Sequence, residues 1–154
     1  MQGWRYCTCP QRRRNVLRSM NNPTGDYTEW LVSRAMGLTL ETNSEKGFDA
    51  TDGQGIRYQI KGRRINSKNA STQLGVMRNY EEKSFDFLVA VIFGANWNVI
   101  RAAQINHETV GQLATFRQHQ NGHVMHLREN VFETSGVEDI KHLLNNYMQE
   151  YSFK

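Results

Sequence analysis

The sequence predicts an α/β protein in which a mixed sheet is flanked by helices. Three observations support this fold class. Residues 24–36 carry apolar side chains at helical spacing, and residues 47–61 alternate as two strands around a glycine-rich turn. Residues 85–93 form a nearly continuous apolar run, which is typical of a strand covered on both faces of a sheet. Because helical patterns precede and follow the strands, we expect helices to flank the sheet.

The first helix is expected over residues 24–36. Thr24 can cap its N-terminus, Asp26 lies favourably in its first turn, and Gly37 follows as a stop signal. The apolar residues spaced to share its buried face are Tyr27, Trp30, Leu31 and Ala35.

Two strands over residues 47–51 and 56–61 are expected to form a hairpin. A loop of Gly53, Gln54 and Gly55 would pair Asp52 with Ile56 and set position 49 opposite position 59. Side chains alternate across a strand, so the two faces differ. The apolar face would carry Phe48, Ala50, Tyr58 and Ile60. The opposite face would carry Asp49, Arg57, Gln59 and Lys61.

The later elements are predicted from the same periodicities and turn signals. Residues 66–83 are polar and are expected to form a loop with a short helix near Met77. The expected elements after this loop are a strand over 85–93, a strand over 98–104, a helix over 107–116, a strand over 122–128 and a helix over 137–151.

Composition is typical of a globular protein. The chain has 154 residues, of which 38% are apolar and 22% are charged, so we expect a single domain over residues 24–154. No stretch approaches the roughly 20 consecutive apolar residues of a membrane span. Two cysteines cannot form a disulfide framework. These features predict a cytoplasmic protein that does not bind membranes.

The positive charge is unevenly distributed. Residues 1–23 are interpreted as a flexible basic leader, of which residues 1–19 need not be native. The net charge is +4, but the five arginines of residues 1–19 leave 14 basic and 15 acidic residues in the remainder. No acid occurs between Gly53 and Tyr80, a segment that contains Arg57, Lys61, Arg63, Arg64, Lys68 and Arg78. This segment indicates either a phosphate-facing surface or a solvated basic face.

Asp49, Gln59 and Lys61 have the chemistry that phosphodiester hydrolysis requires. Mg²⁺, or Mn²⁺ in its place, is held by carboxylate, carbonyl and water oxygens. Asp49 would anchor the metal, with Gln59 and the Ile60 backbone carbonyl as neutral ligands. Lys61 would orient or deprotonate the attacking water, and Glu29 could add a second carboxylate from the first helix. A half-buried hairpin shows the same alternation without any catalysis, so that alternative stays open.

Gly47-Phe-Asp49, followed by Gln59-Ile-Lys61, resembles the PD-(D/E)XK motif of restriction-endonuclease-like nucleases in its Gln-x-Lys variant. Residues 25–32, 43–49, 58–61 and 85–89 resemble an uncharacterised bacterial family of that superfamily, and the similarity runs over roughly residues 24–145. The resemblance implies an αβββαβ core. It also implies active-site roles for Asp49, Gln59 and Lys61, with Glu29 as the helix carboxylate. Gln59 departs from the superfamily, where an acid is commoner and binds metal more strongly.

Three functions follow as hypotheses. The first is a Mg²⁺-dependent nuclease that hydrolyses phosphodiester bonds in DNA. The second is a nucleic-acid-binding module of the same fold with a decayed site, and the third is a protein–protein adaptor with a contiguous exposed apolar patch. The basic residues expected to grip phosphates are Arg57, Arg63, Arg64 and Lys68, with Gln73 and Arg78 extending the surface. A homodimer would supply the two active sites that cutting both strands requires.

Two further features of the sequence have simpler explanations. His119, His123 and His126 are interpreted as turn and surface residues rather than as a zinc site, because their side chains would not converge. Asp86 stands at the start of the apolar strand, where a carboxylate needs a partner, so we expect it to cap the strand or to pair with an arginine.

Overall fold

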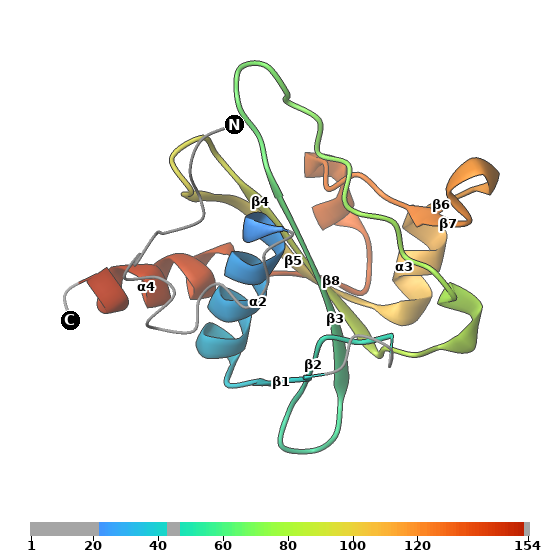
Figure 1. Cartoon of the computed structure of the whole chain (residues 1–154), viewed down its shortest axis with the longest axis horizontal. Helices are drawn as coiled ribbons and strands as arrows, with labels where there is room; N and C mark the ends of the chain where they lie inside the picture. Colours follow the sequence, from blue (N-terminus) through green and yellow to red (C-terminus); the bar gives the residue numbers. More distant parts are fainter. Residues whose placement is uncertain (1–21, 43–46, 153–154) are drawn as a thin grey trace.

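The computed structural model describes residues 22–42 and 47–152 (Figure 1). Most of the predicted basic leader, including Cys7 and Cys9, lies outside the described residues. Within the described ranges the molecule is an α/β protein, as predicted, with a mixed sheet between layers of other elements.

A six-stranded sheet in the order β1-β2-β3-β4-β5-β8 forms the centre of the molecule. Its strands are β1 (Thr39–Leu40), β2 (Ala50–Thr51), β3 (Arg57–Arg64), β4 (Phe87–Phe93), β5 (Val99–Asn106) and β8 (Val137–Asp139). Neighbouring strands are antiparallel except for β3 and β4, which run parallel with Ile60 opposite Val89. A separate antiparallel hairpin joins β6 (Thr115–Arg117) to β7 (Gly122–Val124).

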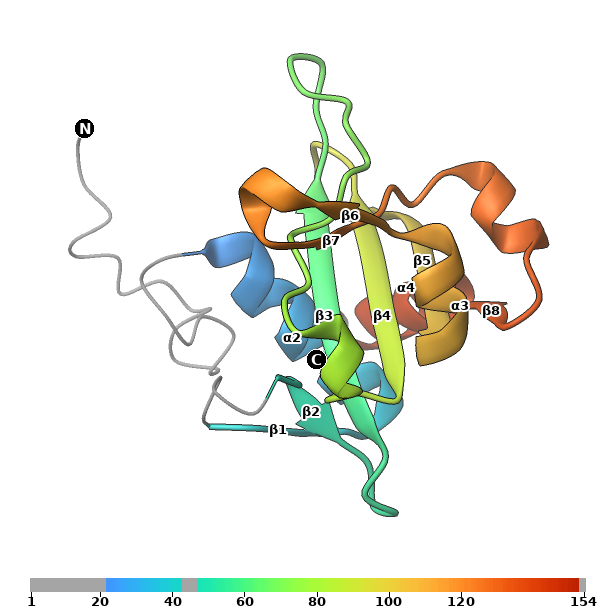
Figure 2. The same cartoon turned by 90° about the vertical axis from the view of Figure 1, so that its right-hand side faces the viewer.

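Different elements cover the two faces of the sheet. Helices α2 (Pro23–Met36) and α4 (Lys141–Ser152) pack on one face, and α3 (His107–Leu113) and the β6–β7 hairpin lie on the other (Figure 1). Figure 2 shows this hairpin crossing the sheet over β3 and β4, beside the chain that leads from β3 to β4. The short 3-10 helices are η2 (Tyr80–Glu82), η3 (Gln118–Gln120) and η4 (Glu129–Glu133).

Helix α2 matches the prediction to within one residue, but its cap is different. Asn22, not Thr24, caps the N-terminus, and its Oδ1 accepts a hydrogen bond of 3.1 Å from the Gly25 N–H. Pro23 occupies the first helical position, where its missing N–H costs nothing. Gly37 ends the helix with φ 68°, in the left-handed region that glycine adopts readily.

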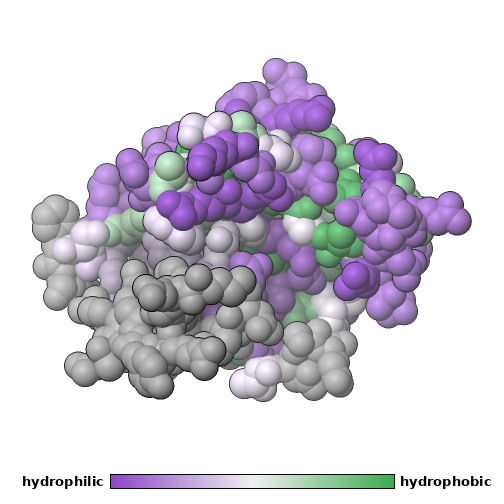
Figure 3. Space-filling model, turned by 45° about the horizontal axis from the view of Figure 1, so that its top comes forward, coloured by the Kyte–Doolittle hydropathy of each residue, from purple (hydrophilic) through white to green (hydrophobic). Residues whose placement is uncertain are grey.

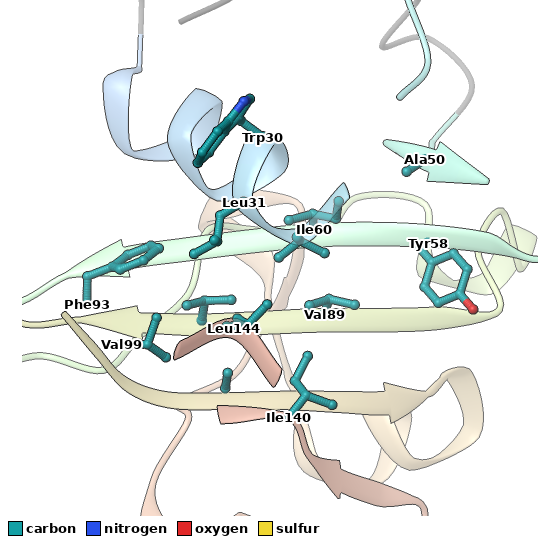
Figure 4. Packing of buried hydrophobic residues seen from close by; sticks show 13 residues of the cluster. Trp30, Leu31, Ala50, Tyr58, Ile60, Val89, Phe93, Val99, Ile140 and Leu144 are labelled. Atoms are coloured by element: carbon teal, nitrogen blue, oxygen red, sulfur yellow. The ribbon is translucent and has the colours of Figure 1, made fainter. Parts of the chain in front are cut away.

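Two apolar clusters form the core, one on each face of the sheet. The first lies under α2 and α4 and includes Leu31, Ala50, Tyr58, Ile60, Val89, Phe93, Ile140 and Leu144 (Figure 4). The second includes Leu74, Met77, Phe85, Leu88, Ala90, Ile92, Met125 and Leu127. Strand β4 contributes alternate residues to both clusters, which confirms that the apolar run is covered on both faces.

Strand β3 alternates in the same way. Tyr58 and Ile60 point into the first cluster, and Gly62 on the same face lies against Thr28 of α2. A Cβ at Gly62 would stand only 1.8 Å from Thr28 Oγ1. Glycine therefore lets α2 pack directly on β3, while Gln59 and Lys61 project from the opposite face.

Phe48 corrects one prediction. It was expected to share a face with Ala50, Tyr58 and Ile60, but it packs against the second cluster on the other side of the sheet. Strand β2 begins only at Ala50, so the alternation of a pleated strand does not extend back to residue 48.

Long-range pairing changes three other predicted elements. The helix expected over 107–116 ends at Leu113, because residues 115–117 pair with β7. The strand expected over 122–128 is limited to Gly122–Val124. The helix expected over 137–151 begins at Lys141, because residues 137–139 pair with β5. In the connection from β3 to β4, the regular structure is the 3-10 helix η2 rather than an α-helix.

The described residues on the face seen in Figure 3 are mainly hydrophilic. Figure 3 shows a face covered largely by hydrophilic residues, with smaller hydrophobic areas between them. Within residues 22–42 and 47–152, the exposed large hydrophobic side chains are Phe116 on β6 and Leu143 on α4. They belong to layers on opposite faces of the sheet, so they do not form one patch. None of the helices in these ranges is long and apolar enough to cross a bilayer.

Candidate active site

The hairpin that joins β2 to β3 has the predicted register. Ala50 pairs with Tyr58, and the Asp52 N–H donates to the Ile56 carbonyl at 3.1 Å. Asp52 also stabilises the turn, because its Oδ1 accepts from the N–H groups of Gln54 and Ile56 at 2.8 and 3.0 Å. The strand pairing ends at Ala50, so the predicted pairing of position 49 with position 59 is not part of it, although the side chains of Asp49 and Gln59 are hydrogen-bonded.

The Asp49 carboxylate is held against β3. Its Oδ2 accepts hydrogen bonds from Gln59 Nε2 and from the Ile60 N–H, both at 2.7 Å. The Asp49 N–H donates to the Tyr58 carbonyl at 2.8 Å. Hydrogen bonds to a charged acceptor are short and strong, so the position of the carboxylate is well defined.

The Ile60 carbonyl lies on the same edge of β3. A strand residue points its N–H and its C=O toward the same neighbouring strand. The Ile60 N–H reaches Asp49 beyond the end of β2, so the Ile60 carbonyl oxygen is also directed to this edge. Carboxylate and carbonyl oxygens therefore meet where β2 stops and β3 continues.

Lys61 projects from the same face of β3 as Gln59. It is half-buried, and its chain lies against Gly75 in the connection from β3 to β4. A Cβ at Gly75 would be 3.8 Å from Lys61 Cδ and 4.0 Å from Nζ. The ammonium group thus stays near the sheet rather than extending freely into solvent.

Glu29 lies on the flank of α2 that faces β2. Thr28 faces the sheet at Gly62, and Trp30 contacts Tyr147 and Tyr151 of α4. Successive helical residues are about 100° apart, so Glu29 lies on the flank away from α4. Helix α2 packs over β3 and α4 packs over β5, and β2 lies on the far side of β3 from β5. The flank of α2 that points away from α4 therefore faces the β2 side of the sheet.

These donors fit Mg²⁺ better than zinc. The described ranges contain no group of three or more His, Cys, Asp or Glu side chains that could hold a metal. His119, His123 and His126 therefore do not make up such a group. Mg²⁺ needs only one or two carboxylates, because it keeps several waters and takes oxygens from substrate phosphates. Asp49 and the Ile60 carbonyl provide such a partial set. An ionised carboxylate only accepts hydrogen bonds, so Gln59 presents its NH₂ group to Asp49 and orients it.

Arg57 and Asp86 form a bidentate ion pair. Arg57 Nη2 and Nε lie 3.0 and 3.1 Å from the carboxylate oxygens of Asp86, and the Arg57 N–H donates to Oδ2 at 2.9 Å. These hydrogen bonds lower the pKa of Asp86 and raise that of Arg57. The expectation that Asp86 pairs with an arginine is confirmed. The positive charge of Arg57 is therefore offset by Asp86, so Arg57 would attract a phosphate less strongly than the other predicted cations.

Arg63 and Arg64 lie at the end of β3, and the other two predicted cations lie in the connection that follows it. Arg63 Nη2 donates to Asn69 at 3.3 Å, and its Nε is buried without a hydrogen-bond partner in the described structure. Arg64 donates to the Ala95 carbonyl at 3.1 and 2.5 Å and stacks on Trp97. Lys68 and Arg78 are exposed in the connection that follows β3. Of these four residues, only Arg63 lies on the same face of β3 as Gln59 and Lys61.

Comparison with known proteins does not add to this geometry. No protein-family model matches the chain, and no curated protein is similar to it in sequence.

Proposed function

We propose that this protein is a metal-dependent nuclease that hydrolyses phosphodiester bonds in DNA. One observation carries the proposal. The Asp49 carboxylate accepts hydrogen bonds from Gln59 and from the Ile60 N–H at the edge of β3. The same strand carries Lys61, two residues after Gln59.

The order of the strands supports a restriction-endonuclease-like core. Helix α2 is followed by the antiparallel strands β1, β2 and β3, and a connection then leads to β4, which runs parallel to β3. The implied αβββαβ core has the same order of helix and strands. The connection differs, because it contains the 3-10 helix η2 where that core has an α-helix.

The chemistry of the site suits phosphodiester hydrolysis. A bound Mg²⁺ or Mn²⁺ would act as a Lewis acid on the phosphate and lower the pKa of a bound water. Asp49 and the Ile60 carbonyl would hold it, with Glu29 as a second carboxylate. Gln59 keeps the Asp49 carboxylate oriented. The Lys61 ammonium offsets negative charge that develops on the phosphate or takes part in proton transfer from water.

A nucleic-acid-binding module with a decayed site is the second candidate. Gln59 replaces the commoner acid and donates to Asp49, which leaves the site with fewer anionic ligands. The cations Arg63, Arg64, Lys68 and Arg78 would then bind phosphates without cleavage. The adaptor hypothesis gains no support, because Phe116 and Leu143 do not form a contiguous patch.

Cleavage assays with defined variants test the proposal. Supercoiled plasmid, linear duplex, single-stranded DNA and RNA are incubated with Mg²⁺ or Mn²⁺, with EDTA as the metal-free control. We expect metal-dependent cutting of DNA that falls at least about 100-fold in Asp49→Ala and in Lys61→Ala, because the first removes the carboxylate that would hold the metal and the second removes the ammonium group beside the phosphate. Linear product formed directly from plasmid would indicate two sites acting together, as in a homodimer.

Two matched variants control for general effects. Glu133→Gln removes an exposed carboxylate on η4, and Lys141→Ala removes an ammonium from α4, on the other face of the sheet from Lys61. Both should cut DNA as the unaltered protein does. Cutting that survives in Asp49→Ala would contradict the proposal. DNA binding without cutting in either metal would favour the decayed binding module.

A further inference from the structure

A polar pocket lies beside the candidate active site, on the face of the sheet opposite α2 and α4. It has a volume of about 330 Å³ and lies where α3, the β6–β7 hairpin and η4 meet. The residues that matter for its chemistry are Gln73, Arg117, His126, Arg128 and Asn130. Its size falls within the range of small-ligand sites, at the lower end.

The pocket is positively charged. Two arginines and a histidine line it, and no Asp or Glu does. Arg117 and Arg128 are exposed, and among the described residues neither lies within 4.0 Å of a carboxylate. The neighbouring acid, Glu129, accepts a hydrogen bond of 2.8 Å from Arg101. A neutral ligand would leave both guanidinium groups without a counter-charge, so the chemistry favours an anion.

His126 lines the same pocket as the two arginines, and its pKa responds to their charges. Burial lowers the pKa of His126, and the charges of Arg128, Arg117 and Arg63 lower it further. Arg117 extends from β6, whereas Arg63 extends from β3, the strand that carries Lys61. Arg117 and Arg128 line the pocket together with His126, and the charge of Arg63 also reaches this imidazole.

One segment of the chain contacts both the pocket and Lys61. Residues 72–77 run beside residues 123–127. The Leu74 N–H donates to the Met125 carbonyl at 2.9 Å, and Gln73 forms an isolated antiparallel β-bridge with His126. Gln73 lines the pocket, and Gly75 lies against Lys61. In an extended segment these two residues are roughly 7 Å apart. The pocket and Lys61 therefore both contact this segment, at residues that are two apart.

We infer that this pocket binds a phosphate group of a nucleic-acid strand that runs on to the Asp49 and Lys61 site. The inference rests on the proposed function for the identity of the occupant. A guanidinium binds phosphate oxygens through two parallel hydrogen bonds, and Arg117 and Arg128 have this geometry available. Asn130 and Gln73 can donate to further oxygens. This contact holds the strand without reading its sequence.

DNA binding measured without cleavage tests the pocket. The probe is a fluorescein-labelled oligonucleotide, single-stranded or duplex, and anisotropy is recorded in EDTA over a range of salt concentrations. Arg117→Gln and Arg128→Gln should each weaken binding roughly threefold or more, and each should reduce the slope of log Kd against log salt by about 0.7 to 0.9. Arg34→Gln, which alters an exposed arginine on α2 in the opposite layer, should leave both quantities unchanged.

An NMR titration gives a second measurement on the unaltered protein. A phosphate beside His126 favours the protonated imidazole, so the oligonucleotide should raise the pKa of His126. The charges that act on this imidazole are those of Arg128, Arg117 and Arg63, and all three stay charged through the titration. In Arg117→Gln, addition of the oligonucleotide should raise the pKa of His126 by less than it does in the unaltered protein.

The outcomes separate this inference from the proposed function. Weaker binding in both arginine variants, in a protein that cuts no DNA, would support the pocket and overturn only the nuclease. Normal cutting with unchanged binding in both variants and no change at His126 would overturn the pocket and leave the nuclease in place. Absence of any DNA binding by the unaltered protein in EDTA would also overturn the pocket.

Discussion

At the scale of single residues, Asp86 joins the two parallel strands of the sheet at one end. Its carboxylate binds both the guanidinium and the backbone N–H of Arg57, and the Asp86 N–H donates to the Arg57 carbonyl at 2.8 Å. The start of β3 is therefore tied to the residue that precedes β4. A carboxylate at the start of an apolar strand indicated that a partner was needed, although the sequence did not identify Arg57 as that partner.

Asp86→Asn tests the strength of this connection. The pair holds the pKa of Asp86 below its ordinary value, so its contribution to stability is complete above the ordinary carboxylate range. It is lost as the pH falls through the lowered pKa. Since both side chains are more than a third exposed, we expect the variant to lose about 1 kcal/mol of unfolding free energy at pH 7.

Urea unfolding of both proteins at pH 7 and at pH 3 measures this effect. The difference between them should shrink at pH 3, because this pH lies below the ordinary pKa of an aspartate and the unfolded chain then binds a proton at this carboxyl. A difference that is the same at both pH values would show that the loss comes from packing rather than from charge. Glu133→Gln serves as the control, because that carboxylate is exposed.

At the scale of elements, the contact of α2 with β3 controls where Glu29 stands. Thr28 is fully buried against Gly62, and its hydroxyl donates to the Thr24 carbonyl at 2.6 Å. The helix can come this close because residue 62 has no side chain. The turn of α2 that carries Glu29 is held over the strand that carries Lys61.

Gly62→Ala should force these two elements apart. The new Cβ would lie 2.7 Å from Thr28 Cβ, an atom that cannot move without the helix backbone. Overpacking of this kind costs about 1 to 3 kcal/mol of unfolding free energy. Gly53→Ala is the matched control, because no other residue has an atom within 4 Å of the added Cβ, and it should change stability by less than about 0.5 kcal/mol. Thermal unfolding distinguishes them, and equal stabilities would contradict the packing described for Gly62.

At the scale of the whole molecule, β4 couples the two apolar clusters. Its alternate side chains enter the cluster under α2 and α4 and the cluster under α3 and the β6–β7 hairpin. Each cluster would lose part of its buried apolar side chains without this strand. The two layers should therefore fold together as one cooperative unit.

Leu31→Ala and Leu88→Ala test this coupling from opposite faces. Both side chains are fully buried, Leu31 in the first cluster and Leu88 in the second. Each variant should lose about 2 to 5 kcal/mol while keeping a single unfolding transition. Denaturant unfolding followed by both tryptophan fluorescence and circular dichroism measures this. Two separate transitions, one shifted by each variant, would show that the clusters fold independently.

Much of the candidate site follows from short-range sequence features. The three-residue turn after Asp52 determines the register, which pairs Ala50 with Tyr58 and brings the Asp49 side chain within hydrogen-bond distance of Gln59. Helix α2 and strand β4 were predictable for the same reason, since capping residues, periodicity and an apolar run act within a few residues. The parallel pairing of β3 with β4 follows from contacts that span the connection between them, and the sequence showed only that a mixed sheet was expected.

The pocket illustrates what local patterns do not reveal. Residues 109–128 contain no Asp or Glu, a signal that could have directed attention to Arg117 and Arg128. That signal does not show that the pocket also contains Gln73, because Gln73 reaches it only when residues 72–77 run beside residues 123–127.

The sequence by itself determined the α/β class, the first helix, the hairpin register and the long apolar strand. The tertiary structure alone decided that residues 137–139 form a strand, that Phe48 packs on the opposite face, and that Gln73 and Arg117 line the same pocket. The physical reason is the range of the interactions. Caps, turns and side-chain alternation act between neighbours along the chain, whereas a three-residue strand or a charged pocket exists only through partners that are distant in sequence.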